Sequence, residues 1–167
     1  MNITIKKQRR RSMALQLTPK GVHILIPNNL NEDDKQVQSF IERSLQNLPE
    51  PPQQIEQAHA PETVYDLVEQ WVDRIGVDIQ RTQIREMTTK WGSISTAGYL
   101  TLADDLLWLP LKLVEYVIVH ELMHLKFPNH AKGWQVSMGM YLPDWRERER
   151  QLQAYALVQP TNNTEEV

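Results

Sequence analysis

The stretch VIVHELMHLKFPNH, residues 117–130, holds three of the chain's five histidines around a single glutamate. In a helix, His120 and His124 stand four residues apart, so their rings project from one face about one turn apart. That separation suits two imidazoles that bind one metal ion through nitrogen. Glu121 follows the first histidine directly, where its carboxylate can act as a general base on a water beside the ion.

His130 completes the set because Pro128 cannot continue a helix, so the chain has to turn just before it. The turn predicts that His130 returns towards the first two histidines. Three protein ligands with an open fourth position are typical of a catalytic zinc site. A downstream carboxylate is the rival third ligand, but residues 131–143 contain no Asp or Glu. The sequence therefore favours His120, His124 and His130 as the metal ligands.

The alternative is that these are core histidines on an apolar helix. At this chain's own His and Glu frequencies, HExxH arises by chance in about one such chain in 100, and adding His130 lowers this to roughly one in 3,000. Ionisable rings on so apolar a helix are costly to bury without a partner. The flanking residues are apolar and can exclude water from the site: Val117, Ile118, Val119, Leu122 and Leu125.

Composition restricts both the kind of protein and the kind of metal site. The chain has 167 residues, of which 41% are hydrophobic and 23% charged, and a net charge of −3. These values fit one globular domain rather than a general binder of nucleic acid or membrane. The absence of cysteine excludes disulfides, thiolate nucleophiles and cysteine-ligated zinc. No stretch approaches the roughly 18 apolar residues of a membrane span, and no apolar signal region is visible, so we expect a cytoplasmic protein.

Hydrophobic periodicity predicts the order of the elements. Residues 3–26 alternate as strands do, with a hairpin at TPKG, and a helix with Asn31 as its N-cap follows. An amphipathic helix ends at Gly76, residues 77–102 are extended, and Pro110 opens the apolar helix that carries the histidines. We expect one domain over residues 1–158, made of an N-terminal β-hairpin and helix over 1–48, a Pro-rich connection over 49–62 and a core over 63–158, with a disordered tail over 159–167.

Three segments resemble the YgjP-like metallopeptidase family (domain of unknown function 45), which is related to the SprT-like and WLM zinc proteases. They are KWGSISTAGYLTL at residues 90–102, VIVHELMHLKFPNHAKGW at 117–134 and YLPDWRERERQL at 141–152. The resemblance covers most of the chain and is strongest over residues 77–156. It implies an α+β, zincin-like fold in which the HExxH helix packs against a small, mostly antiparallel sheet.

The resemblance also implies roles for the site residues. It makes His120, His124 and His130 the ligands of one zinc ion and Glu121 the base of a metallopeptidase. The histidine spacing equals that of the metzincins as well, but Phe127 stands where those enzymes require glycine, so the YgjP-like family is preferred. The chain departs from the family pattern at three positions, where Arg, Cys and Phe are usual: Lys90, Ile94 and Gly133.

Further residues are predicted to shape the site, each with a plainer alternative. Lys90 and Tyr141 are candidates to stabilise a developing oxyanion, although Tyr141 could pack in the core and Lys90 could be a solvated charge. Trp91 and Gly92 either lie beside the metal or act as a core anchor and a turn. Trp134, four residues after the last histidine, is expected to pack around the site.

Three functions stay open from the sequence. The leading one is a zinc peptidase, in which a strand within 94–102 could form a sheet edge that binds an extended peptide or could lie in the sheet interior. The second is a phosphoanhydride or nucleotide hydrolase that uses KKQRRR, residues 6–11, or Lys90 to hold phosphate. The third is a non-catalytic module with structural zinc. Glu121 counts against it, because a structural site does not need a carboxylate in the position of a base. The basic stretch KKQRRR could also bind nucleic acid weakly, or it could be an edge strand whose charges prevent pairing with other chains. The expected partner is a peptide or a small molecule.

Overall fold

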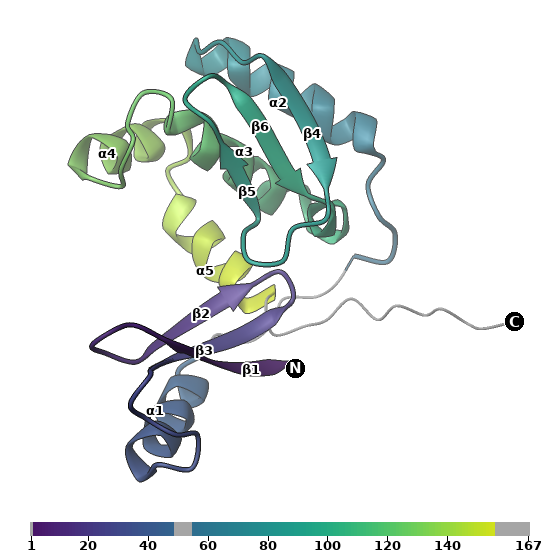
Figure 1. The fold of residues 1–167 in the computed structure, drawn as a ribbon. Helices are drawn as coiled ribbons and strands as arrows, with labels where there is room; N and C mark the ends of the chain where they lie inside the picture. Colours follow the sequence, from purple (N-terminus) through teal and green to yellow (C-terminus); the bar gives the residue numbers. More distant parts are fainter. Residues whose placement is uncertain (1, 49–54, 156–167) are drawn as a thin grey trace, which may run out of the picture.

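The centre of the molecule is helix α3, which carries the histidine motif and is apolar on nearly every side. In the computed structural model, which describes residues 2–48 and 55–155, α3 (Leu111–Met123) has eight buried residues among its thirteen. Neighbouring elements pack against it from several directions (Figure 1), namely α2 (Pro61–Ile75), α4 (Lys132–Tyr141), α5 (Trp145–Tyr155) and β5 (Gly92–Ile94). A helix that is apolar all round belongs in a core, and α3 is the axis of this one.

A three-stranded sheet covers one side of α3. Its strands are β4 (Arg81–Arg85), β6 (Tyr99–Ala103) and β5, in the order β4-β6-β5. β6 lies in the middle, parallel to β4 and antiparallel to β5, and four of its five residues are buried. The short 3-10 helix η1 (Asp104–Trp108) then leads into α3. β5 is therefore an edge strand, and it is the strand that packs on α3.

A second sheet is formed by the N-terminal region of the chain. It contains β1 (Ile3–Gln8), β2 (Ala14–Thr18) and β3 (Gly21–Pro27), in the order β1-β3-β2, and α1 (Lys35–Gln46) packs against it. β3 is parallel to β1 and antiparallel to β2. The buried core of this region consists of four residues, Val22, Ile24, Ile26 and Val37. An ion pair of 3.1 Å between Lys20 Nζ and Asp105 Oδ2 ties the β2–β3 turn to η1.

The predicted α+β class is confirmed, and the HExxH helix packs against a small sheet as the resemblance implied. One detail needs correction, because each sheet is mixed rather than mostly antiparallel. In both sheets the second strand forms a hairpin with the third, and the third strand then inserts beside the first, which makes that pair parallel. No helix in the portion of the chain that the structure describes is long and apolar enough to cross a membrane.

The boundaries of two predicted helices can be checked directly. The helix ending at Gly76 is confirmed, since Gly76 has φ 74° and ψ 45°, a left-handed C-cap that glycine adopts without strain. The prediction of Asn31 as an N-cap is wrong. The helix begins at Lys35 after Asp34, whose carboxylate accepts a hydrogen bond from the Asn31 backbone at 2.8 Å and closes a turn before the helix. The predicted tail 159–167 and residues 49–54 of the Pro-rich segment lie outside the described residues.

Candidate metal centre

The end of α3 places two histidines on one face and returns the third to them. His120 lies in the last turn, and His124 is the C-cap residue with φ −66° and ψ −16°, so the helical spacing of the two rings continues past the last helical residue. Pro128 follows in an irregular segment that brings His130 back before α4 begins. The helix and the proline turn therefore act together, as the sequence indicated.

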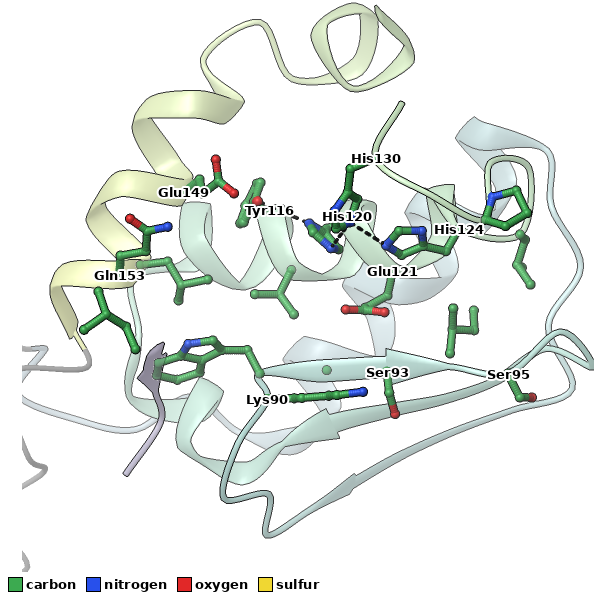
Figure 2. A pocket seen from close by; sticks show the side chains of 18 of the residues that line it. Lys90, Ser93, Ser95, Tyr116, His120, Glu121, His124, His130, Glu149 and Gln153 are labelled. Atoms are coloured by element: carbon green, nitrogen blue, oxygen red, sulfur yellow. Dashed lines mark hydrogen bonds between the residues drawn. The ribbon is translucent and has the colours of Figure 1, made fainter. Parts of the chain in front are cut away.

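The nitrogen atoms of the three rings converge on one point. His130 Nε2 lies 2.9 Å from His124 Nε2 and 3.2 Å from His120 Nε2, and one ligand atom from each of the three residues lies within 4.8 Å of the other two (Figure 2). Three imidazole nitrogens this close are suited to a shared cation with Zn–N distances of about 2.0–2.1 Å. The donor set thus fits a divalent transition metal that prefers nitrogen ligands.

The second nitrogen of two of these rings is held by a hydrogen bond. His124 Nδ1 is 3.0 Å from the Phe127 carbonyl oxygen, which can only accept, so Nδ1 carries the hydrogen and Nε2 keeps a free lone pair. His120 Nδ1 is 3.2 Å from the Tyr116 hydroxyl. Burial is the largest cause that raises the pKa of Tyr116, and the nearby Glu149 carboxylate raises it further, so the hydroxyl keeps its proton. When His120 binds metal through Nε2, its Nδ1 carries the hydrogen and the Tyr116 oxygen accepts it. Such outer contacts orient the rings of metal-binding histidines.

Burial keeps two of the three histidines, His120 and His124, in the form that binds metal. It is the largest cause that lowers the pKa of His120, to about 3, with the charges of His124 and His130 acting in the same direction. Burial also lowers the pKa of His124, although the hydrogen bond to the Phe127 carbonyl opposes this. Neutral imidazole is the ligand form, so the site is prepared for a metal ion at neutral pH.

Trp134 forms the back wall of this cluster. Its ring centroid lies 5.0, 6.0 and 4.6 Å from those of His120, His124 and His130. The indole is 2% exposed, and Trp145 of α5 packs edge-on against it at 5.3 Å. Trp134 therefore packs around the three histidines as its spacing predicted, and it restricts where their rings can move.

Glu121 points from α3 towards β5, across the space beside the histidines (Figure 2). Burial raises the pKa of Glu121 to about 7, and the positive charge of Lys90 opposes the shift. Gly92 of β5 permits the close approach of strand and helix here. A Cβ at that position would meet Glu121 Cγ at 3.1 Å and Val117 Cγ1 at 3.2 Å. Gly92 thus shapes the space around the carboxylate.

A cleft of about 680 Å³ runs between α3 and β5 and contains the three histidines and Glu121. Lys90, Trp91, Gly92 and Ser93 line it from the β5 side. At the other end of the cleft lie residues of α5, among them Glu149 and Gln153 (Figure 2). Leu17 of β2 also lines the cleft, which means that the N-terminal sheet contributes to its wall.

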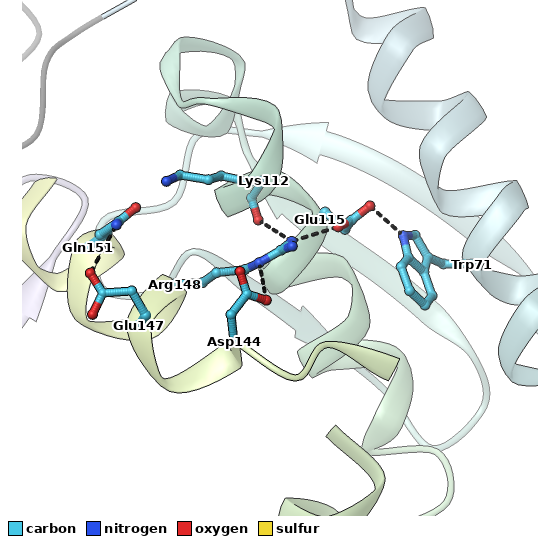
Figure 3. A network of polar contacts seen from close by, with 7 residues as sticks. All are labelled: Trp71, Lys112, Glu115, Asp144, Glu147, Arg148 and Gln151. Carbon is cyan, nitrogen blue, oxygen red and sulfur yellow. Dashed lines mark hydrogen bonds and ion pairs between the residues drawn. The ribbon is translucent and has the colours of Figure 1, made fainter. Parts of the chain in front are cut away.

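A polar network outside the cleft fixes α5 against α3 (Figure 3). Arg148 of α5 contacts Glu115 Oε1 at 2.6 Å and Asp144 Oδ1 at 2.9 Å, and it donates to the Lys112 carbonyl at 3.0 Å. Glu115 also accepts a hydrogen bond of 3.2 Å from the Trp71 indole of α2. The network joins three helices and sets the position of α5, which brings Glu149, the residue after Arg148, beside Tyr116, the residue after Glu115 (Figure 2).

The remaining predicted residues separate into two groups. Lys90, Trp91 and Gly92 line the cleft. Tyr141 does not, because its ring packs edge-on against Trp71 at 6.1 Å. The basic stretch 6–11 lies on and after β1, the sheet edge opposite β2, and does not line the cleft either.

Two residues of the site were missed by sequence reasoning, Tyr116 and Glu149. Tyr116 stands four residues before His120, so helical spacing could have found it. Glu149 stands in RERER, a run typical of a solvated charged face, and nothing local to it indicates which acid turns towards α3.

Comparison with known proteins finds one matching family and several similar structures. A family model described as "YgjP-like, metallopeptidase domain" matches residues 31–155. No curated protein matches the chain. Among solved structures, the metallopeptidase zymogen abylysin of Pyrococcus abyssi is 26% identical, with a TM-score of 0.49 over 53% of this chain and 90% of that one. The metallopeptidase zymogen jannalysin of Methanocaldococcus jannaschii is 23% identical, with a TM-score of 0.49 over 53% and 92% of the two chains.

Proposed function

Because the chain belongs to the YgjP-like metallopeptidase family, we propose that it hydrolyses peptide bonds with one zinc ion bound by three histidines. The proposed ligands are His120, His124 and His130, and the proposed general base is Glu121. The observation that carries the proposal is the convergence of three imidazole nitrogens beside a half-buried carboxylate in an open cleft. A zinc ion, when bound, supplies Lewis-acid chemistry that makes water more acidic and polarises a carbonyl group.

The protein's own residues supply the proton acceptor. Glu121 is attached to the same helical turn as His120, so its position relative to the histidines is fixed by the backbone. Its carboxylate faces the cleft, and the raised pKa makes it a stronger base than an exposed glutamate. In this proposal Glu121 takes a proton from the attacking water and passes it to the leaving amine.

The edge of the sheet supports a peptide as substrate. β5 pairs with β6 on one side, and its other side faces the cleft. An extended peptide can add to such an edge through backbone hydrogen bonds and lie beside Glu121. Lys90 lines the same wall as a cation near Glu121 and is the proposed electrostatic aid to the developing oxyanion. The alternative substrate, a phosphoanhydride, has less support because residues 6–11 lie outside the cleft, which leaves Lys90 as the one lysine or arginine among the described residues that line it.

The proposal is tested by incubating zinc-loaded protein with an unstructured protein such as casein and, separately, with nucleoside triphosphates. We expect cleavage of casein that a chelator abolishes and added zinc restores, with the triphosphates left intact. A chelator-insensitive activity, or hydrolysis of triphosphates alone, would overturn the assignment.

A further inference from the structure

The wall that α5 contributes to the cleft carries a carboxylate with no cationic partner among the described residues. Both arginines that flank Glu149 in the sequence turn to other acids. Arg148 pairs with Glu115 and Asp144 at 2.6 and 2.9 Å, and Arg150 pairs with Glu147 at 2.6 Å. The acids with cationic partners lie away from the cleft, whereas Glu149 is half-buried and lines it.

The contacts of Glu149 leave it able to bind a ligand. Its carboxylate lies beside the Tyr116 side chain (Figure 2), and a carboxylate has about four acceptor positions, so most of its capacity stays free. Gln153, one turn further along α5, adds a second polar group to the same wall. A half-buried carboxylate without a cation is unfavourable, and a positively charged group of a ligand would remove that cost.

The surroundings of Glu149 fit a long side chain that ends in a cation. Leu152 of α5, Trp91 beside β5 and Leu17 of β2 line the same cleft with apolar surface. Lysine and arginine bury an aliphatic stem against such surface while the charged end reaches a carboxylate. An indole can add a cation–π contact. The cleft also contains Lys90 and Glu121, whose opposite charges already offset each other.

We propose that Glu149, with Tyr116 and Gln153, forms a subsite for a lysine or arginine side chain of the peptide substrate. The inference rests on the proposed peptidase function and adds a substrate preference to it. The Tyr116 hydroxyl lies 3.2 Å from His120 Nδ1, and Tyr116 lies beside Glu149 in the same cleft (Figure 2), so the subsite adjoins the metal centre. The basic residue therefore lies close to the bond that is cleaved.

The test uses fluorogenic peptides that differ at single positions near the scissile bond, where Lys, norleucine or Glu is placed, with free and acetylated amino termini. We expect wild type to favour Lys over norleucine by about tenfold in kcat/KM, the effect of one charge-assisted contact. Glu149→Gln, which keeps the size of the side chain and removes its charge, should reduce the ratio to about one, and Glu149→Lys should favour Glu. The matched control Glu147→Gln, on the exposed side of α5, should keep the wild-type ratio.

A binding measurement separates this inference from the proposed function. Zinc-loaded Glu121→Gln and Glu121→Gln/Glu149→Gln proteins are titrated with the Lys and norleucine peptides. If only the first prefers Lys, the subsite stands even when wild type cleaves no peptide. Equal affinities in the first protein, or a Lys preference that survives Glu149→Gln, would overturn the subsite. A Lys preference that is lost on acetylation of the amino terminus would overturn it too, because the bound cation would then be the terminal amine.

Discussion

The two sheets of this molecule share one topology but differ in what they support. In each, the third strand lies in the middle, parallel to the first and antiparallel to the second. The N-terminal sheet packs on α1, an amphipathic helix with one buried residue, over a core of four buried residues. The C-terminal sheet packs on α3, with eight buried residues in a core of 23. The strand order alone therefore does not indicate where a site lies.

The difference lies in the helix and its surroundings. α3 is held by α2, α4, α5 and β5, so the rings at its end are fixed relative to one another. A binding constellation needs such support, because small displacements of ligand groups weaken it. Among the described residues, one ion pair links the N-terminal sheet to η1, and Leu17 of β2 contributes to the cleft wall. We expect changes in the C-terminal half to alter metal binding and catalysis, and changes in the N-terminal half to have small effects on both.

The largest effect is expected at Glu121. Glu121→Gln should lower peptide hydrolysis by about 10³-fold, the usual contribution of a general base, without loss of zinc. Because burial raises the pKa of Glu121 to about 7, the folded apoprotein retains a proton that the unfolded chain releases above its ordinary pKa of 4.5. The stabilisation of the folded apoprotein by this proton is fully present below pH 4.5 and is lost as the pH rises through 7.

The same substitution should therefore stabilise the apoprotein by about 2 kcal/mol at pH 8 and leave it unchanged at pH 4. Urea unfolding of chelated wild type and variant at both pH values checks this. Equal stability at pH 8 would show that the carboxylate carries no burial cost, and full activity of the variant would exclude the general-base role.

The next effect concerns the network that fixes α5. Arg148→Met leaves Glu115 half-buried without its cation and should lower the free energy of unfolding by about 2 kcal/mol. Arg150→Met is the matched control, because the ion pair of Arg150 with Glu147 has side chains 60% and 49% exposed, and the loss of so exposed a pair should change the free energy of unfolding far less. Chemical denaturation of the three proteins measures both. Equal losses in the two variants would contradict a structural role for the network.

A smaller effect is expected where Tyr116 orients His120. Tyr116→Phe removes the hydroxyl that accepts from His120 Nδ1 and keeps the ring, so the core stays packed. Zinc affinity should fall by about tenfold, in the range found for outer contacts of metal ligands. Competition with a chelator of known affinity measures the change. Unchanged affinity would mean that the helix and Trp134 alone orient the ring.

The smallest effect is expected at the junction of the two sheets. Lys20→Met breaks the ion pair with Asp105, whose partners are 40% and 13% exposed, and should cost less than about 1 kcal/mol of stability. Zinc affinity should be unchanged, because the pair lies outside the cleft. A loss of zinc in this variant would show that the N-terminal sheet supports the metal centre after all, and the contrast between the two halves would fail.

Much of the C-terminal half could be predicted from the sequence because its signals are local. Helical spacing joined His120 to His124, and Pro128 predicted the return of His130. Gly76 marked the end of a helix through its left-handed conformation. Each of these inferences depends on neighbours within about ten residues.

The features that escaped prediction depend on contacts between distant segments. Only the pairing of α5 with α3 shows that Glu149 faces the cleft while Glu147 faces solvent, since the two acids look alike in RERER. The position of β6 between its neighbours, and the contact of Tyr141 with Trp71, likewise follow from packing rather than from local pattern. Asn31 and Asp34 are both good capping residues, and the choice between them came from the turn that Asp34 closes.

The central claim is that three histidines at the end of α3 hold one metal ion. Metal content after reconstitution with zinc tests it most directly, measured by mass spectrometry on wild type, His130→Ala and His59→Ala. His59 is the control, because it is a half-buried histidine outside the cluster whose Nε2 lies 2.8 Å from the Leu109 carbonyl oxygen. We expect one zinc per chain in wild type and His59→Ala and much less than one in His130→Ala. Equal zinc content in all three proteins, or none in wild type, would contradict the account.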